Sequence, residues 1–380
     1  MKCKDGTITV NPIWKTAFLD AVIVGVIAHG YMLFNKISYH DDTIFLFSFG
    51  GTYSSGRWVL GIVENILDKT LGLYSTPVFT GSISIILIGM SAALACDVLR
   101  IRSKLGAAYI GAIMASFPVV AGIFAYMFTA GMYIASLFLS VLGVYVLSDR
   151  YNFKRCLAAC LMAISTGIYQ AFLASSASLM IMALFIHGLD HPDRKFQAFF
   201  QEALVYAATF IGGVAFYFVM NKICLMWKDV ELTSYQGING HYDILKLPAK
   251  IVDVYHSFLG GGYEEINGQY LLSHSVKVVI ILTLAGALLM IGNKQLNKLC
   301  KMWLLFLLMI FPLAVYLVKL FSTDENFHVY TLMVYSLVYV YIFPICIIER
   351  TDCTAERVVL RFGRYIGSSI VDAYAHICVL

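Results

Sequence analysis

Long apolar runs separated by short polar segments recur along the whole chain, and they limit what it can fold into. A helix needs roughly 20 mostly apolar residues to cross the hydrocarbon core of a membrane. Only 13% of the residues are charged, whereas about 25% are charged in a typical soluble domain. The sequence therefore predicts an all-α polytopic membrane protein, a bundle of about 10–11 transmembrane helices. The expected spans are 17–35, 75–95, 105–121, 124–147, 157–168, 171–187, 199–223, 275–292, 302–320, 328–348 and a final run at 366–380.

The distribution of basic residues predicts the orientation. The run 157–187 is long for one span and short for two. If it forms a hairpin with its tip at Gly167-Ile168-Tyr169-Gln170, 18 of the 27 Lys and Arg residues face the cytoplasm, as the positive-inside rule requires. A single span would turn the basic clusters near 294–301 and 350–364 outward. We therefore predict the hairpin, a cytoplasmic N-terminus followed by a retained signal anchor, and outer segments that include 36–74 and 224–274.

The first outer segment carries two adjacent carboxylates, Asp41 and Asp42, preceded by His40. Carboxylates beside a membrane span are costly to desolvate and need a reason. One reason is a catalytic base or a substrate ligand, and the other is a helix N-cap ahead of Thr43. We expect one carboxylate in each role. The histidine spacings match no zinc pattern, so no metal site is expected.

An amphipathic helix follows Arg57, and it is expected to lie in the membrane interface. Arg57 and Glu64 fall on its polar face, opposite a stripe made by Val59, Ile62, Val63, Ile66 and Leu67. The Arg57 guanidinium could bind a phosphate through two parallel hydrogen bonds. Alternatively, Arg57 snorkels and Trp58 belongs to an aromatic belt. The sequence leaves both interpretations open.

A second amphipathic helix is expected after Pro248, ending at Gly260-Gly261-Gly262 in the outer segment 224–274. Tyr169 and Gln170 interrupt the apolar hairpin, where they either close the turn or line a cavity. The chain has no Walker, GxGxxG, HExxH or GxSxG motif, so neither a nucleotide donor nor a cofactor is expected. No basic run exceeds two residues, and we expect no nucleic-acid partner.

Three short motifs in this order, Asp41-Asp42, Gly56-Arg57-Trp58 and Tyr169-Gln170, resemble those of the bacterial and phage O-antigen glucosyltransferases of serotype conversion, most closely their type II branch. The resemblance covers roughly residues 10–350. It implies a GT-C-like fold and glucose transfer from undecaprenyl-phosphate glucose to lipid-linked O-antigen at the periplasmic face of the bacterial inner membrane. It further implies a small flippase and a bactoprenol glucosyltransferase as companion proteins.

The resemblance also implies roles for individual residues. Asp41 or Asp42 would deprotonate the acceptor hydroxyl, and Arg57 would hold the donor phosphate. We expect the substrate cavity to include His40, Trp58, Glu64, Tyr169 and Gln170. The glycosyltransferase domain would occupy residues 1–350. The segment 351–380 departs from the family pattern, and we expect it to be a basic cytoplasmic stretch with a truncated last span.

The main alternative function is a lipid-linked glycan flippase or transporter without transferase chemistry. Transporters place ionisable residues near the bilayer midplane, in broken helices. Here 12 of the 23 Asp and Glu residues lie in the expected outer segments. A glycan polymerase or ligase would more often carry an Arg-rich outer loop, and 224–274 contains no Arg. The distribution of charge therefore favours a glycosyltransferase.

Overall fold

The computed structural model describes residues 2–4, 7–9, 11–35, 40–45, 47–73, 76–148, 152–233, 244–260, 273–321 and 335–351. Within these ranges, eight helical segments are long and apolar enough to cross a membrane. They are α1 (Pro12–Phe34), α3 (Pro77–Val98), α4 with α5 (Lys104–Ser116 and Pro118–Ala125), α6 (Met127–Leu147), α8 (Phe172–Asp190), α9 (Phe196–Lys228), α11 (Ser273–Asn293) and α12 (Lys298–Val315). The protein is therefore an all-α polytopic membrane protein, as predicted.

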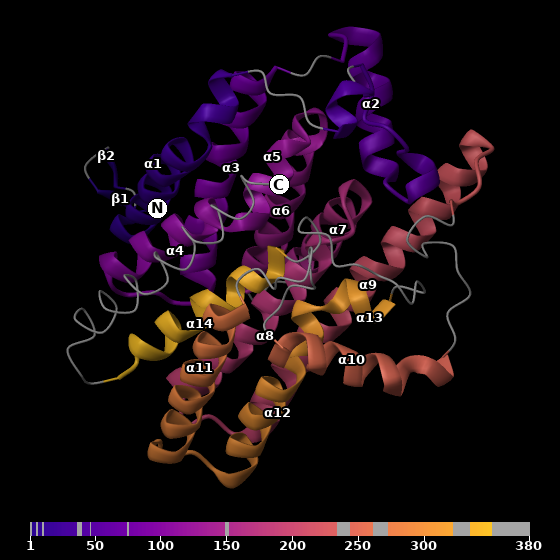
Figure 1. Cartoon of the computed structure of the whole chain (residues 1–380). Coiled ribbons are helices and arrows are strands. Elements are labelled where there is room, and N and C mark those ends of the chain that lie inside the picture. Colours follow the sequence, from indigo (N-terminus) through magenta and orange to yellow (C-terminus); the bar gives the residue numbers. More distant parts are fainter. Residues whose placement is uncertain are drawn as a thin grey trace.

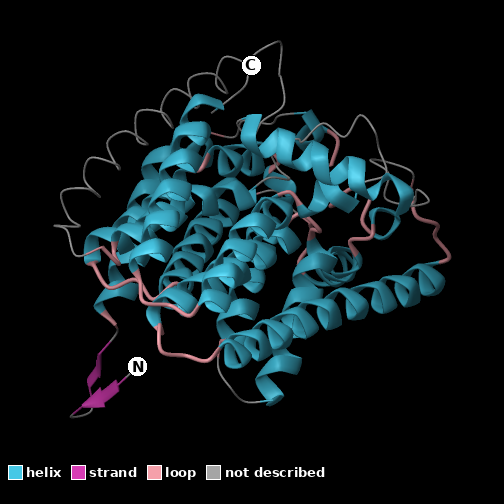
Figure 2. Cartoon of the chain, turned by 90° about the horizontal axis from the view of Figure 1, so that it is seen from below, coloured by secondary structure: helices cyan, strands magenta, loops and turns pink. Residues whose placement is uncertain are grey.

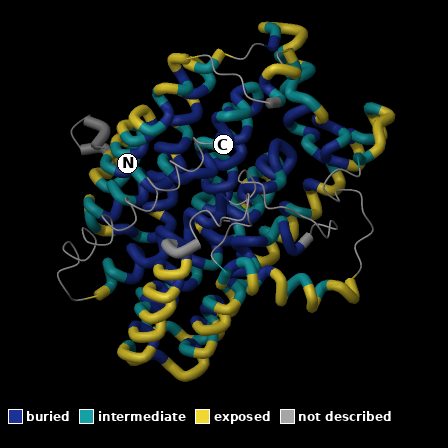
Figure 3. The backbone as a smooth tube through the Cα atoms, in the orientation of Figure 1, coloured by how far each residue is buried: buried dark blue, intermediate teal, exposed yellow. Residues whose placement is uncertain are grey.

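The shorter helices complete the bundle: α2 (Trp58–Thr70), α7 (Asn152–Ile168), α10 (Leu247–Gly260), α13 (Leu317–Phe321) and α14 (Val338–Ile348). Helices α1, α3 and α4 pack on one another, α6 contacts α3 and α7, and α8 contacts α6 and α12 (Figure 1). The buried residues concentrate in the middle of the bundle, whereas much of α11 and α12 is exposed (Figure 3). An exposed apolar surface of this kind suits contact with lipid.

A two-stranded antiparallel ladder precedes the bundle. Strand β1 (Lys2–Lys4) pairs with β2 (Thr7–Thr9), with Cys3 opposite Ile8. Figure 2 shows the two strands projecting away from the helices. This small element was not expected from the sequence, in which apolar periodicity begins only later.

The hairpin expected over 157–187 is present as α7 and α8, joined by a turn at Tyr169–Ala171. Serine pairs tie both helices to α6. The Ser136 hydroxyl donates to the Ser165 carbonyl at 2.8 Å, and Ser140 lies 2.8 Å from the Ser176 hydroxyl. Hydrogen bonds between helices are favourable where no water competes for them. They fix the hairpin against α6, the helix that carries much of the candidate site.

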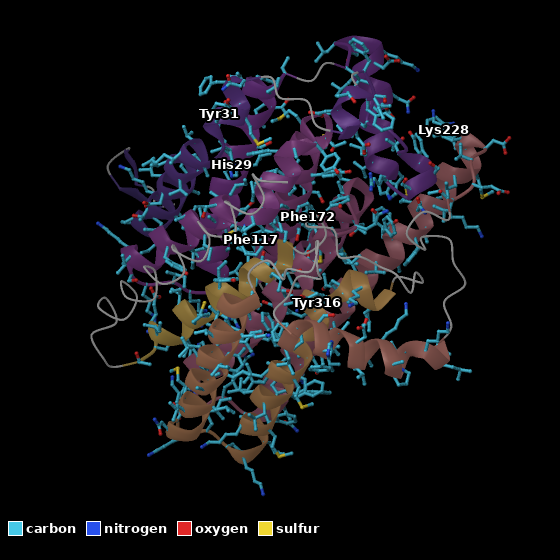
Figure 4. The ribbon with its side chains drawn as sticks, viewed as in Figure 1. His29, Tyr31, Phe117, Phe172, Lys228 and Tyr316 are labelled. Carbon is cyan, nitrogen blue, oxygen red and sulfur yellow. The ribbon has the colours of Figure 1, made fainter. Side chains whose placement is uncertain are left out.

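The third span is not one continuous helix, contrary to the expectation for 105–121. Helix α4 ends at Ser116, Phe117 is extended, and α5 begins at Pro118. Proline has no N–H and disfavours helical geometry in the residue before it. The His29 Nε2 donates to the Ala115 carbonyl at 2.8 Å, and the Tyr335 hydroxyl donates to the Met114 carbonyl at 2.9 Å. Two carbonyls left over by the break are therefore satisfied by other helices; Figure 4 labels His29 and Phe117.

The last spans also differ in detail from the expectation. The run 302–320 is interrupted at Tyr316, between α12, which contains Pro312, and α13. The described part of the run 328–348 is the helical stretch Tyr335–Ile348. The expected final run 366–380, and all of the tail after residue 351, lie outside the described residues.

Both expected amphipathic helices are present, as α2 and α10. Helix α10 contacts α12 and α13; in Figure 1 it extends to the right from the upper end of α12, below α13. In α2 the side chain of Leu60 is fully buried, whereas Ile66, on the expected apolar stripe, is 56% exposed. Val59 and Ile62 of the expected stripe pack on the buried cluster that contains Trp58, so only the later part of the stripe, at Ile66, faces away from the protein.

Candidate active site

Arg57, which immediately precedes α2, is held by two stacked tyrosines. Its NH1 atom donates a hydrogen bond of 2.9 Å to the Tyr133 hydroxyl on α6. Its guanidinium carbon lies 5.1 Å from the ring centroid of Tyr169 and 5.7 Å from that of Tyr133. A guanidinium over aromatic faces gains cation–π attraction. These contacts fix the direction of the planar fork, which two-pronged recognition of a phosphate requires.

The turn in front of Arg57 strongly favours glycine. Gly56 follows the 3₁₀ helix Tyr53–Ser55 with φ of 71°, a conformation that disfavours a Cβ atom. Its carbonyl accepts a hydrogen bond of 3.0 Å from the Tyr217 hydroxyl on α9. A Cβ added at Gly56 would lie 2.7 Å from that hydroxyl oxygen. Backbone conformation and close packing therefore both favour glycine here.

Gln170 connects the hairpin tip to the same turn. Its Nε2 donates to the Ser55 carbonyl at 2.7 Å and to the Tyr217 hydroxyl at 3.3 Å. The pair Tyr169-Gln170 therefore does more than close its own turn, because one residue contacts Arg57 and the other holds the backbone that precedes Arg57. Tyr133 and Tyr217 were not singled out from the sequence. A single tyrosine in an apolar helix gives no signal that separates a site residue from a core residue.

Asp42 serves as a helix cap, although for a distant helix. Its Oδ1 accepts a hydrogen bond of 2.9 Å from the backbone N–H of Phe128, in the first turn of α6. The residue is only 5% exposed. Asp41 shares the 3₁₀ helix His40–Thr43 and is less deeply buried. The side chain of His40 lies outside the part of the chain that the structure describes.

Glu64 organises the loop that joins Asp42 to Arg57. Its carboxylate accepts hydrogen bonds from the Phe49 N–H at 2.8 Å and from the Thr52 hydroxyl at 3.2 Å. Nearby, the Tyr53 hydroxyl accepts a hydrogen bond of 3.0 Å from Asn65, and burial raises the pKa of the Tyr53 phenol. Glu64 and Asn65 of α2 thus hold the loop that leads to Arg57.

Trp58 is buried, with 6% of its surface exposed. A Cβ atom added at Gly167 would lie 2.7 Å from the Trp58 ring, so α2 and α7 approach closely at this point. This packing places Trp58 between two helices.

Asp42 and Arg57 both contact residues in the first two turns of α6. Asp42 binds residue 128 and Arg57 binds residue 133 of that helix. Five residues of α-helix correspond to a rise of about 7.5 Å. The two side chains are therefore attached to α6 at positions less than two turns apart.

An apolar cavity of about 470 Å³ adjoins this region, between α2, α3 and α6. Its lining includes Phe45, Phe79, Ile83, Leu87, Phe128 and Met132. The backbone N–H of Phe128 is the one that binds Asp42. Among the described residues, no group of three His, Cys, Asp or Glu side chains is placed to hold a metal ion. The site therefore combines a carboxylate pair, an oriented guanidinium and an adjoining apolar groove.

Comparison with known proteins gives one match. A family model described as glucosyl transferase GtrII matches residues 30–341. The search of curated proteins and the search of solved structures each found no match. The matched region begins within α1 and extends into α14, and it contains every site residue discussed above.

Proposed function

Because this chain belongs to the GtrII glucosyl transferase family, we propose that it moves glucose from a polyprenyl-phosphate donor to lipid-linked O-antigen or a similar surface glycan. The reaction would take place at the periplasmic face of the bacterial inner membrane. A bactoprenol glucosyltransferase would make the donor and a small flippase would deliver it. The observation that carries the proposal is the Arg57 guanidinium, oriented by Tyr133 and Tyr169, with Asp42 bound to the same helix as Tyr133.

The proposed chemistry needs one base and one cation. A carboxylate takes the proton from an acceptor hydroxyl, and the hydroxyl oxygen forms a bond to the anomeric carbon of glucose. The bond between that carbon and the phosphate oxygen breaks, and the polyprenyl phosphate leaves with an additional negative charge. Arg57 stabilises that charge as it develops. The direction of the guanidinium is set before the reaction, so little reorganisation is needed.

We assign the base to Asp41. One oxygen of Asp42 already accepts the Phe128 N–H and joins the loop to α6. Asp42 is also the more deeply buried of the two residues. Asp42 then fixes the 3₁₀ helix on which Asp41 is carried, and Asp41 meets the acceptor.

The cavity between α2, α3 and α6 supports a lipid-linked substrate. Its lining is mainly apolar, and it lies beside Phe128, next to the carboxylates. An isoprenoid chain could lie in such a groove while its polar head reaches the carboxylates and Arg57. Binding energy from the remote chain would help to position the reacting atoms.

One observation favours the alternative of a flippase, namely the broken helix at Phe117, because transporters use broken helices near the membrane midplane. However, Phe117 and His29 are almost fully buried, and the carbonyls of Ala115 and Met114 accept hydrogen bonds from His29 and Tyr335. A satisfied break inside a packed core offers no lining for a translocation path. We therefore retain the transferase.

The proposal is tested with purified protein in lipid nanodiscs. The protein is given undecaprenyl-phosphate glucose labelled in the sugar and a lipid-linked O-antigen unit, and the product is identified by mass spectrometry. We expect transfer of label from this donor and none from UDP-glucose. Transfer from UDP-glucose alone would contradict the proposed donor. Movement of the donor lipid across a vesicle membrane without transfer would contradict the transferase and favour the flippase.

A further inference from the structure

A second cavity, lined by several charged residues, lies at the opposite end of the bundle from Arg57. It has a volume of about 790 Å³ and forms where α3, α6 and α8 end and α7 and α9 begin. Helix α6, which reaches from one site to the other, is about 30 Å long at 1.5 Å per residue. The charged and histidine residues of the lining are Arg100, Arg155, Arg194, His187, His191 and Glu202. This cavity has no part in the proposed transfer.

The carboxylates around this cavity are already engaged. Glu202 binds His187 Nδ1 at 2.5 Å and also pairs with Arg194. Asp190, just outside the lining, binds the Nε and NH2 atoms of Arg350 at 2.8 Å each. Neither acid is therefore available to attract a cation into the cavity.

Two arginines supply surplus positive charge. Arg100 lies 3.9 Å from Asp190, whose carboxylate Arg350 already holds. Arg155 lines the cavity from the first turn of α7, and within the described ranges its guanidinium forms no ion pair. A partly enclosed site with unbalanced guanidinium groups suits a phosphate, which arginine binds through parallel hydrogen bonds.

The backbone at Arg100 is a second, independent observation. Arg100 has φ of 53° and follows the last residues of α3. The Ile101 N–H bonds the Cys96 carbonyl and the Arg100 N–H bonds the Asp97 carbonyl. This pattern of bonds usually places glycine where Arg100 stands. A side chain kept in a backbone conformation that disfavours it points to a use for that side chain.

The cavity opens toward the lipid-facing side of α9. Leu204 lines it and is 52% exposed. Ile211, seven residues later and so on the same side of the helix, is 66% exposed. A lipid head group in the cavity would therefore leave its acyl chains along an apolar stripe of α9.

We propose that this cavity binds the phosphodiester head group of an anionic phospholipid, in the membrane leaflet opposite to the Arg57 site. Basic pockets between transmembrane helices are suited to such head groups. A lipid head group in the cavity would connect the inner ends of α7 and α9. It would thereby stabilise two helices that also reach the Arg57 site: α7 through Gly167, which packs on Trp58, and α9 through Tyr217.

The test compares lipid binding by native mass spectrometry of purified protein in detergent. Phosphatidylglycerol is compared with zwitterionic phosphatidylethanolamine for the wild type, Arg155→Gln and Lys298→Gln. Lys298 is an exposed cation at the same end of the bundle and does not line the cavity. We expect the wild type to retain phosphatidylglycerol preferentially. Arg155→Gln should weaken that binding about fivefold, since one basic residue near a membrane contributes at about that level, and Lys298→Gln should leave it unchanged.

A second arm separates a lipid from a soluble phosphate. Inorganic phosphate is titrated against the thermal stability of the same three proteins. Stabilisation by phosphate that Arg155→Gln abolishes, without preference for phosphatidylglycerol, would identify a phosphate-bearing solute and overturn the lipid assignment. If Arg155→Gln and Lys298→Gln weaken phosphatidylglycerol binding equally, the binding depends only on general surface charge. That result would also overturn the lipid assignment.

Discussion

The ring of Tyr133 stacks on the ring of Tyr169, with centroids 4.0 Å apart and an interplanar angle of 9°. One ring comes from the middle of the chain on α6 and the other from the turn between α7 and α8. Arg57 contacts both. The direction of a single guanidinium thus depends on three segments of the chain, and the serine pairs between α6 and the hairpin keep those segments together.

Replacing Arg57 by lysine should reduce transfer on the order of 10²-fold, the scale of losing one positioned donor at a developing charge. Lysine keeps the charge but not the planar fork. The measurement is the initial rate against donor concentration in nanodiscs. Tyr133→Phe removes only the hydrogen bond to Arg57 and should cost less. If the lysine variant matches the wild type in rate and donor dependence, Arg57 is an interfacial anchor and binds no phosphate.

Asp41→Asn should lower the transfer rate on the order of 10²–10⁴-fold, because the amide keeps the shape of the carboxylate but cannot take a proton. The melting temperature should not change. Asp68→Asn is the matched control, since Asp68 is an exposed carboxylate on α2. Near-normal transfer by the Asp41 variant would remove Asp41 from the mechanism.

Asp42→Ala should act mainly on stability. It removes the acceptor for the Phe128 N–H at the start of α6, and loss of a helix cap typically costs about 0.5–2 kcal/mol. Thermal unfolding of the purified variant should show a lower midpoint, and Asp42→Asn, which keeps an acceptor oxygen, should show a smaller decrease. If Asp42→Ala melts like the wild type and yet is inactive, the roles of the two carboxylates are exchanged.

The roles of Asp41 and Asp42 show which features of the candidate site could be predicted from the sequence and which could not. The pair stood out because two adjacent acids beside a span are rare, and a cap was one of the two expected roles. The N–H that Asp42 binds belongs to a residue 86 positions later in the chain, so no local pattern could identify the helix that it caps. Tyr133 and Tyr217 are missing from the predictions for the same reason, since their partners are a side chain and a carbonyl from another part of the chain.

The spans were the more predictable part. Apolar runs gave the helices, and the positive-inside rule correctly separated α7 from α8. The break at Phe117 had a local signal in Pro118, but hydropathy averages over such a residue. Tolerance of the break depends on His29 and Tyr335, which are remote in the sequence.

Gly56→Ala should sharply reduce both activity and stability. The new Cβ would lie 2.7 Å from the Tyr217 hydroxyl, and φ of 71° would strain any residue with a side chain. Adding Tyr217→Phe relieves the contact but not the strain, so stability should recover only in part. The measurements are thermal unfolding and transfer in nanodiscs for both variants. An active Gly56→Ala protein would show that the position of Arg57 does not depend on this turn.

The orientation is tested by labelling in intact spheroplasts with a membrane-impermeant maleimide. Thr70 at the end of α2 and Lys298 at the start of α12 are exposed residues, at the Arg57 end and the opposite end respectively. Thr70→Cys should be labelled before lysis and Lys298→Cys only after it. Each is compared with the unmodified protein to account for the natural cysteines. The reverse pattern would place the candidate active site in the cytoplasm.

The break at Phe117 also bears on the order in which the protein is synthesised. His29 is already present when the third span is made, whereas Tyr335 follows its partner Met114 by 221 residues. Until the ribosome has added Tyr335, the Met114 carbonyl lacks its final hydrogen bond, at a depth where water is scarce. Completion of this span therefore waits for one of the last helices to insert. Both carbonyls at the break can therefore be paired as in the folded protein only after Tyr335 has been synthesised.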